Sequence, residues 1–437
     1  MMTSEMKIKV EKVVYGGNGL ARTESSDSPL TVFVPYTLPG ETIEATLSQR
    51  TDTLADATLD KVLVPSADRV PPRCLHFGAC GGCQYQHATY DAQLAIKRQT
   101  LQETLQRAGL EALPEISVHS ADPWEYRNRI RLRLFMRQRQ LQVGYQRRAS
   151  NDFLPVTMCP IAAPLLWKAV EALRSMQGTA IRWLEAANEV ELFCNRDRLQ
   201  LTLFLRNRLP LDFNRFGEEL QQALPELAGA GTMVLEKTGR NRKTQRYRSD
   251  SSWAADGLSY VVGDESYWVS RGSFFQVNRS ILDMLVKLVT ADRSGHLAWD
   301  LYAGVGLFSR VLTKRFKEVT AVEAAADDLL RSFRGNGRHS IDATVVGFLQ
   351  QAVLQRDRPD LVVVDPPRAG LGEEVCALLA RLRTPEVVYV SCDPVTLGRD
   401  LRQMVDSGYR LHELHLVDMF PQTFHQETVA VLSHTAR

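Results

Sequence analysis

The chain has 437 residues, of which 44% are hydrophobic and 24% charged, and its formal net charge is +2. This composition is typical of soluble globular proteins, and the length allows two or three domains. No apolar run is long enough to cross a bilayer, and the N-terminal residues lack the apolar core of a secretory signal. Membrane and exported proteins are therefore disfavoured, and we expect a cytoplasmic protein.

The first 60 residues or so have the pattern of short strands joined by turns. Lys7–Glu11 alternates in polarity, Tyr15–Gly19 is a glycine-rich turn, and Thr31–Val34 is a second strand that ends in the turn Leu38–Glu41. Short strands with such turns are typical of a small β-barrel. Pro65 and the prolines after it mark its end, so residues 5–64 are predicted to form a barrel.

Three cysteines follow closely in a glycine-containing segment: Cys74, Cys80 and Cys83, with Cys159 further along the chain. Four thiolates can bind a tetrahedral zinc ion or an iron–sulfur cluster. Zinc sites usually take their ligands from two short pairs, whereas here three are clustered and one is remote. The spacing therefore favours a [4Fe-4S] cluster over zinc, with unliganded core cysteines as the other alternative.

Two basic stretches point to a polyanionic partner. Residues 126–148 contain eight arginines and no acid, and Lys237–Arg248 is the second stretch. The alternation around Ile130 places Arg129, Arg131 and Arg133 on one face of a strand, aimed outward together. Each stretch alone could be a solvated strand face or a surface loop without a partner. Two basic patches in one chain favour nucleic acid as the binding partner.

From about Trp268 apolar strand-like runs alternate with helical segments, which predicts an α/β domain with a doubly wound sheet. The predicted strands are Leu297–Asp300, Glu318–Glu323, Leu361–Asp365, Val387–Ser391 and Val429–Leu432.

The loop after the first of these strands carries a glycine pair. Asp300 to Phe308 includes Gly304 and Gly306, and Glu323 ends the next strand as a candidate acceptor for a ribose hydroxyl. The third glycine of a dinucleotide fingerprint and a Walker phosphate loop are both missing. The pattern therefore favours a compact adenosyl ligand over a dinucleotide.

Two further strands end in reactive residues. Asp365-Pro-Pro presents a carboxylate on a rigid turn, and Arg368 follows where enzymes that methylate exocyclic amines commonly carry an aromatic residue. Cys392 follows the next strand, and Glu427 precedes the last. A thiolate that adds to C6 of a pyrimidine activates C5, and a separate base must then remove the C5 proton. The alternative for Cys392 is an inert buried thiol, and the alternative for Glu427 is a solvated charge at a strand end.

Together these motifs resemble the RNA uridine C5-methyltransferases. The resemblance covers nearly the whole chain and is carried by Phe274–Asn278, the Asp300 loop, Asp365–Arg368, Ser391–Pro394 and His425–Val429. Residues 5–64 look like a TRAM domain, an oligonucleotide-binding barrel, and the cysteine segment looks like the [4Fe-4S] site of the 23S ribosomal RNA branch.

The resemblance implies a domain organisation and a set of site residues. A TRAM barrel would cover 5–64, a mixed α+β central iron–sulfur and RNA-binding domain 65–265, and a Rossmann-like class I methyltransferase domain 266–437. The helical segment near 91–110 would pack on the catalytic domain. Cys392 would be the nucleophile and Glu427 the base, and Cys74, Cys80, Cys83 and Cys159 would hold the cluster. The S-adenosylmethionine and base pocket would be lined by Gln276, Tyr302, Leu307, Glu323 and Asp365.

Three positions depart from the family pattern. Leu307 and Asp393 stand where relatives often carry Asn, and the charge of Asp393 is expected to raise the pKa of the neighbouring thiol. The segment 345–350 lacks the acid or amide that holds adenine, so Phe348 or the backbone is expected to replace it.

The leading hypothesis is a monomeric enzyme that makes 5-methyluridine in structured RNA, most simply 23S rRNA, with tRNA as the alternative substrate. A radical methylthiotransferase, a non-catalytic RNA-binding protein and a 5-methylcytidine enzyme are the competing hypotheses. The last is disfavoured because its relatives carry cysteines at two strand ends, and the Asp365 strand end has none.

Overall fold

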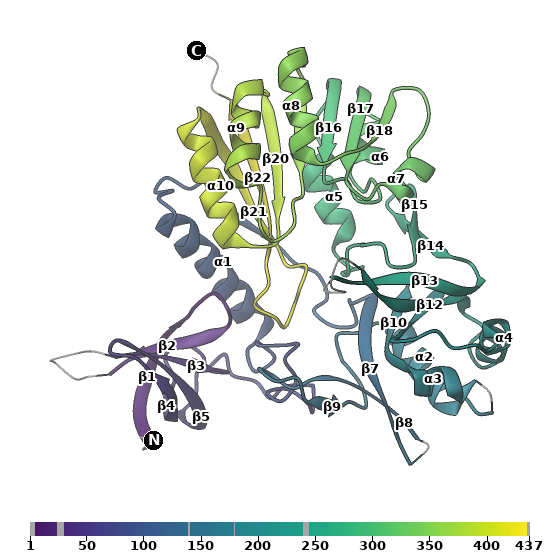
Figure 1. Ribbon diagram of the computed structural model, residues 1–437. Helices are drawn as coiled ribbons and strands as arrows, with labels where there is room; N and C mark the ends of the chain where they lie inside the picture. Colours follow the sequence, from purple (N-terminus) through teal and green to yellow (C-terminus); the bar gives the residue numbers. More distant parts are fainter. Residues whose placement is uncertain (1–4, 24–29, 139, 179, 239–243, 435–437) are drawn as a thin grey trace. The chain divides into compact units, whose positions relative to one another are not determined.

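The computed structural model describes residues 5–23, 30–138, 140–178, 180–238 and 244–434 (Figure 1). The chain forms two compact units. The first unit contains residues 1–120, 366–380 and 389–437, and the second unit contains residues 121–365 and 381–388. The domain boundaries at residues 64 and 265 stay predictions. None of the helices in the described ranges combines the length and the apolar character that a membrane crossing requires.

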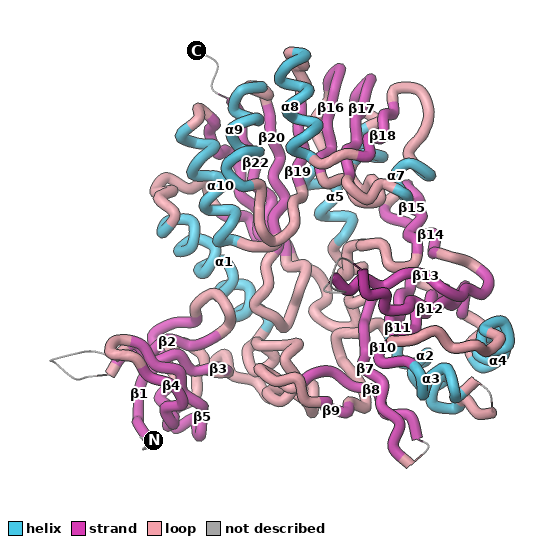
Figure 2. The backbone as a smooth tube through the Cα atoms, viewed as in Figure 1, coloured by secondary structure: helices cyan, strands magenta, loops and turns pink. Residues whose placement is uncertain are grey.

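The first unit begins with the predicted barrel, which is closed by five strands in the order β1-β2-β3-β5-β4 (Figure 2). The strands are β1 Glu5–Val13, β2 Asn18–Arg22, β3 Thr31–Pro35, β4 Thr42–Arg50 and β5 Leu54–Val64. Alternating residues such as Val10, Val32 and Ile43 point inward and are almost fully buried. The alternation seen in the sequence is therefore the inside–outside alternation of a barrel.

The rest of the first unit combines one early helix with the last strands of the chain. The strand order is β20-β22-β21-β6, and the helix α1 contacts α10. The bounds are α1 Tyr90–Arg107, β6 Ile116–His119, α9 Gly372–Leu382, β20 Glu386–Ser391, α10 Pro394–Asp406, β21 Tyr409–Val417 and β22 Glu427–His434. The helical segment expected near residues 91–110 is confirmed as α1. α9 and β20 each begin in one unit and end in the other.

The second unit contains a largely antiparallel sheet of seven strands in the order β13-β12-β11-β10-β7-β8-β9. Its strands are β7 Arg129–Arg137, β8 Gln140–Gln146, β9 Phe153–Pro155, β10 Ala187–Cys194, β11 Leu199–Leu205, β12 Leu227–Thr238 and β13 Thr244–Ala254. The helices beside it are α2 Pro164–Ser175, α3 Ile181–Ala186 and α4 Phe213–Ala223, and β14 Gly257–Val262 pairs with β15 Glu265–Ser270.

The second unit also contains a parallel sheet with the strand order β18-β17-β16-β19-β20. Its elements are α5 Leu282–Thr290, β16 Gly295–Leu301, α6 Ser309–Leu312, β17 Phe316–Glu323, α7 Asp327–Ser332, β18 Arg338–Asp342, α8 Val345–Gln355 and β19 Leu361–Val364. All four residues of β19 are buried, as expected for a central parallel strand. The strand order reverses between β16 and β19, which confirms the doubly wound arrangement and makes this pair the topological switch point.

Candidate active site

The loop after β16 lies at the carboxyl ends of the parallel strands of the second unit. The N–H of Ala303 donates to the carbonyl of Val322 at 3.0 Å, and the N–H of Gly304 donates to the Glu323 carboxylate at 2.9 Å. Gly304 has a φ of 55°, and a Cβ added there would meet no atom within 4 Å. The loop is therefore tied to the end of β17 and leaves open space over its backbone, at the switch point where doubly wound sheets bind ligands.

A buried carboxylate lies directly beneath this loop. Asp300 is fully buried, and one of its oxygens accepts hydrogen bonds from the backbone and the hydroxyl group of Ser309. Its other oxygen, Oδ1, has no hydrogen-bond partner. Burial raises the pKa of Asp300 to about 7, and the charge of Glu323 contributes to this increase. The two hydrogen bonds from Ser309 act in the opposite direction and lower the pKa. Sequence reasoning named the Asp300 loop but missed this side chain as a site residue.

Asp365 follows β19, the neighbour of β16, so the predicted strand-end position is correct. Burial, and then the charge of Asp300, raises the pKa of its carboxyl group. A buried carboxyl group whose ionisation is disfavoured by a neighbouring acid at a switch point is typical of a functional site rather than of a stabilising contact.

The other predicted cofactor residues are held by contacts within the second unit. Gln276 is buried, and its backbone carbonyl accepts from the Asn128 side-chain amide at 3.0 Å. Leu307 is buried, and its carbonyl accepts from the Tyr267 hydroxyl at 2.9 Å. Tyr302 has a φ of 64° in the Asp300 loop. Their roles toward a cofactor stay predictions. The same holds for Phe348 of α8, whose ring packs edge-on against the ring of Trp299 in β16.

In the first unit Cys392 and Glu427 lie at one edge of the sheet. Cys392 directly follows β20, and the helix α10 connects β20 to β21, so the carboxyl ends of both strands meet at one edge. β22 lies between them and runs antiparallel to β21, with Glu427 opposite Val417 at the carboxyl end of β21. The two predicted catalytic residues therefore come from neighbouring strands.

The turn around Cys392 is also the start of α10. Asp393 is the N-cap residue, and its Oδ1 accepts from the N–H groups of Val395 and Thr396 at 2.9 and 3.0 Å. Cys392 therefore directly precedes the N-cap of a helix of thirteen residues, whose N-terminal end carries a partial positive charge. Asp393, which the sequence suggested only as an unfavourable charge, has a structural role in ending the strand and starting the helix.

Glu427 is almost fully buried, and the segment before it, residues 418–426, is held by α1. The residue at its centre, Gln422, has a left-handed φ of 69°. The Gln422 N–H donates to Gln93 Oε1, and Gln93 Nε2 donates to Gln422 Oε1, both at 3.0 Å. The Gln422 carbonyl accepts from the N–H groups of Gln84 and Tyr85, both at 2.9 Å. These bonds stabilise an unfavourable backbone conformation five positions before the predicted base.

Two further polar residues of α1 complete this attachment. Lys97 and Asp418 form an ion pair at 2.6 Å with both side chains fully buried, and Lys97 also donates to the carbonyl of Phe420. Thr100 accepts from Gln426 at 2.7 Å. Sequence reasoning found the apolar residues of α1 and missed these polar ones, because their partners lie more than 320 residues away.

The clustered cysteines lie in the first unit and Cys159 in the second. The Gly82 N–H donates to the Cys80 sulfur at 3.4 Å. Burial and the charge of Cys74 raise the pKa of Cys80, and the bond from Gly82 partly offsets this increase. Among the described residues, no group of three or more His, Cys, Asp or Glu side chains is arranged to hold a metal ion. The iron–sulfur ligand set therefore stays a prediction.

The predicted arginine strand is confirmed as β7, with Ile130, Leu132 and Leu134 buried. Arg129, Arg131 and Arg133 lie on the opposite face, as expected, and none of them is buried. They are nevertheless engaged within the protein: the partly buried Arg129 lies over the Phe193 ring and donates to the carbonyl of Ser273, and the exposed Arg131 forms an ion pair with Glu189. The arginine side chains thus contact aromatic rings and carboxylates of neighbouring strands. The sequence of one strand does not show which residues its neighbours bring to these contacts.

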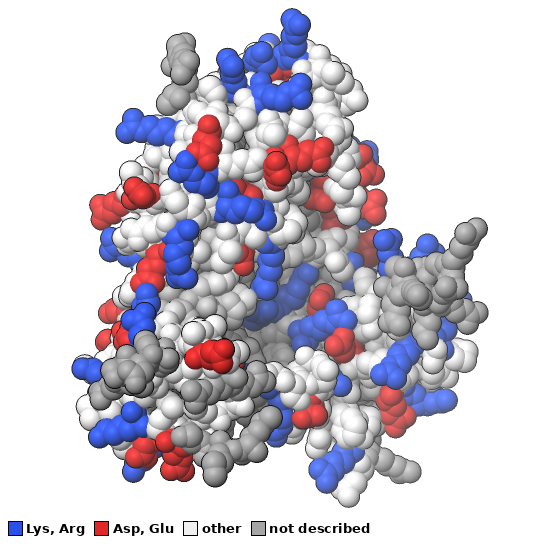
Figure 3. All heavy atoms as spheres, turned by 60° about the vertical axis from the view of Figure 1, so that its left-hand side comes forward, with Lys and Arg blue, Asp and Glu red and all other residues white. Residues whose placement is uncertain are grey.

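The second basic stretch lies on the β12–β13 hairpin, where Arg248 forms an ion pair with Glu236 at 3.2 Å. Arg240, Arg242 and Lys243 lie outside the described residues. Over the face drawn in Figure 3, Lys and Arg side chains are interspersed with Asp and Glu. The charge on that face is mixed, in agreement with the small net charge of the chain.

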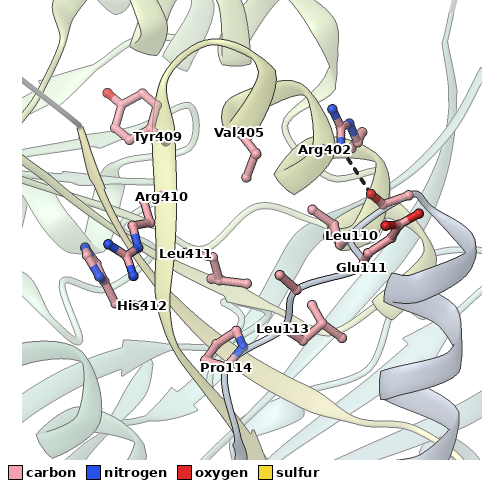
Figure 4. A pocket seen from close by; sticks show the side chains of 12 residues that line it. Leu110, Glu111, Leu113, Pro114, Arg402, Val405, Tyr409, Arg410, Leu411 and His412 are labelled. Atoms are coloured by element: carbon pink, nitrogen blue, oxygen red, sulfur yellow. Dashed lines mark hydrogen bonds between the residues drawn. The ribbon is translucent and has the colours of Figure 1, made fainter. Parts of the chain in front are cut away.

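A pocket of about 790 Å³ lies elsewhere in the first unit (Figure 4). It is lined by residues 109–114, by Arg402 and Val405 of α10, and by 409–412 at the start of β21. Arg402 donates to the carbonyl of Gly109 at 3.0 Å across one side. Because Glu427 pairs with the other end of β21, this pocket is distinct from the site of Cys392 and Glu427.

Comparisons with known proteins give consistent results. The family model for tRNA (uracil-5-)-methyltransferases matches residues 89–342 and 344–435. An uncharacterized RNA methyltransferase of Aquifex aeolicus is 31% identical over 99% of both chains. A 23S rRNA (uracil(1939)-C(5))-methyltransferase of Chromohalobacter salexigens is 30% identical over 98% of this chain and 89% of its own.

Among solved structures, the Pyrococcus abyssi tRNA (uracil-54, C5)-methyltransferase in complex with S-adenosyl-L-homocysteine superimposes with a TM-score of 0.72. The two sequences are 21% identical, and the match covers 98% of this chain and 100% of that one. At this identity the similarity shows a shared fold, which agrees with the predicted methyltransferase architecture.

Proposed function

The chain belongs to the tRNA (uracil-5-)-methyltransferase family, and from this premise we propose the reaction that it catalyses. The predicted family is thereby confirmed, and with it the activity class, an enzyme that transfers a methyl group to C5 of uracil in RNA. The reaction uses Cys392 as nucleophile and Glu427 as base. The observation that supports this assignment most is that the two residues end and begin neighbouring strands at one edge of the sheet.

The chemistry follows from the poor reactivity of C5 in a free uracil ring. The Cys392 thiolate forms a bond to C6, and the electrons of the C5=C6 double bond move toward O4 as an enolate. C5 then takes the methyl group, and the donor sulfur leaves as a neutral thioether. Glu427 accepts the C5 proton, the electrons of the C–H bond restore the C5=C6 double bond, and the C6–S bond breaks to release the thiolate. Atoms and charges balance without a further reactant.

The methyl donor is S-adenosylmethionine, which supplies an electrophilic methyl group on a sulfonium. The site at the switch point fits such a ligand because Asp300 Oδ1 is a buried acceptor without a partner and the backbone of Gly304 has open space above it. Ammonium and hydroxyl groups of the donor would satisfy such acceptors. The residues proposed to line the site are Gln276, Tyr302, Leu307, Glu323 and Asp365, and we add Asp300 to this proposal because of its unpartnered oxygen.

The substrate is 23S rRNA, since a relative that matches this chain over almost its whole length is named for that RNA. tRNA is the second candidate, because the family model and the solved structure carry tRNA in their names. We propose, as expected from the sequence, that the enzyme acts as a cytoplasmic monomer.

Transcripts of 23S rRNA segments and of tRNA, incubated with the protein and labelled S-adenosylmethionine, distinguish the two substrates. We expect 5-methyluridine in one 23S segment only, measured by mass spectrometry of nuclease digests. Methylation of tRNA alone would favour the second candidate, and methylation of neither RNA would reject the proposed function.

The remaining prediction concerns a [4Fe-4S] cluster on Cys74, Cys80, Cys83 and Cys159. Two observations support this prediction: three of the four thiols lie within ten residues of sequence, and the Gly82 amide donates to the Cys80 sulfur. Protein purified without oxygen should contain about four iron atoms per chain and lose them in the Cys80→Ala variant. Iron content unchanged by that substitution would contradict the ligand set.

A further inference from the structure

The turn Tyr15–Gly17 of the N-terminal barrel contacts the segment of the predicted nucleophile. The Tyr15 hydroxyl donates to Asp393 Oδ2 at 3.1 Å, across 378 positions of sequence. Asp393 directly follows Cys392 and uses its other oxygen to cap α10. Both oxygens of this carboxylate are thus fixed, one by the barrel and one by the helix that begins at the nucleophile.

The same turn contacts the segment that leads to the predicted base. The Tyr15 ring packs edge-on against Phe424, with 5.5 Å between ring centroids and an interplanar angle of 86°. Gly17 has a φ of +87°, and a Cβ added there would lie 3.0 Å from Gln84 Cβ and 3.5 Å from Phe424 Cβ. Phe424 itself donates its N–H to Gln84 Oε1 at 3.4 Å. The barrel turn therefore packs against a residue three positions before Glu427.

We propose that Tyr15 is a positioning residue for methyl transfer: through its hydrogen bond to Asp393 it fixes the turn that carries Cys392. This inference deepens the proposed function and rests on Cys392 as the nucleophile. It gives the barrel a role in the chemical step, in addition to the RNA binding that its fold suggests.

The electrostatics of the contact support this role. A carboxylate beside a reacting thiolate opposes the negative charge on sulfur, and a donated hydrogen bond disperses part of the charge of that carboxylate. Burial, and then the charge and hydrogen bond of Asp393, raises the pKa of Tyr15 far above neutrality, so the hydroxyl keeps its proton and remains a donor. The bond also holds the Asp393 side chain at the first turn of α10, directly after Cys392.

The test uses full-length Tyr15→Phe protein and a 23S rRNA transcript that contains 5-fluorouridine, which traps the covalent complex. The substitution keeps the ring against Phe424 and removes only the hydroxyl. We expect the rate of complex formation at saturating RNA to fall about tenfold, since hydrogen bonds to charged groups contribute on that scale, with the Kd for RNA unchanged. A purely RNA-binding barrel predicts the reverse, a raised Kd and an unchanged rate at saturation, and that result would overturn the inference.

Two further variants make the test specific. In an Asp393→Asn background, which keeps the helix cap but removes the charge, Tyr15→Phe should change the rate less than twofold. A full tenfold loss in that background would show that Tyr15 does not act through Asp393. The control is Lys12→Met, which removes a different contact of the barrel, the 2.6 Å ion pair with Glu103, and should leave the rate unchanged. If the wild-type protein forms no complex, the proposed function fails; if it does and Tyr15→Phe matches it, only the present inference fails.

Discussion

A Cys392→Ala protein is expected to form no covalent complex with RNA that contains 5-fluorouridine, and its methyl transfer to uridine should fall by at least about 10⁴-fold. Without the thiolate, C6 is not attacked and C5 never gains the electron density that it needs to accept a methyl group. Denaturing gel electrophoresis of protein and labelled RNA measures the complex directly. S-adenosylmethionine binding, measured by calorimetry, should stay the same, because the substitution leaves the proposed residues of the donor site in place.

The matched control for this variant is Cys376→Ala. Cys376 is a buried thiol of α9 in the same unit, and burial raises its pKa to about 12, so it holds its proton and is a poor nucleophile at neutral pH. Its loss should leave complex formation intact at the expense of some stability. A covalent complex that persists in Cys392→Ala and disappears in Cys376→Ala would refute the assignment of the nucleophile.

The second large effect is expected for Glu427→Gln. The amide has nearly the shape of the carboxylate but cannot accept the C5 proton, so the enzyme methylates C5 once and cannot release the product. A covalent complex with ordinary uridine RNA should accumulate, and steady-state turnover should fall by about 10² to 10⁴-fold. A stoichiometric burst of methyl transfer followed by very slow turnover is the kinetic signature to be measured.

Glu413→Gln is the control for the loss of one carboxylate nearby. Glu413 lies on β21, the strand paired with β22, and its side chain is largely exposed. Its substitution should leave turnover within about twofold, because exposed charges rarely contribute much. Turnover by Glu427→Gln at the wild-type rate, with no trapped complex, would show that another group removes the proton.

The buried polar contacts of α1 show how the predicted base is held in place. Gln93, Lys97 and Thr100 all bind the segment 418–426, and a lysine and an aspartate without solvent exposure are tolerated only because each is paired. The same segment accepts hydrogen bonds from Gln84 and Tyr85, directly after Cys83. Disturbance of the cysteine segment is therefore expected to reach the base-bearing strand through backbone hydrogen bonds.

The sequence by itself determined the elements and the residues at their ends. Alternation and turns predicted the barrel, and runs of buried apolar residues predicted β16, β17, β19, β20 and β22. Because parallel strands present their carboxyl ends at one edge, it followed that Asp365 and Cys392 would each lie at such an edge. These inferences depend only on periodicity and on the chemistry of neighbouring residues.

Only the tertiary structure decided which distant groups meet. The bond between Tyr15 and Asp393 and the ion pair between Lys97 and Asp418 join residues more than 300 positions apart. The packing of the Arg129 guanidinium over the ring of Phe193 likewise depends on a neighbouring strand. A local pattern specifies which face of an element is apolar, whereas a buried polar contact exists only once two such faces have packed and excluded water.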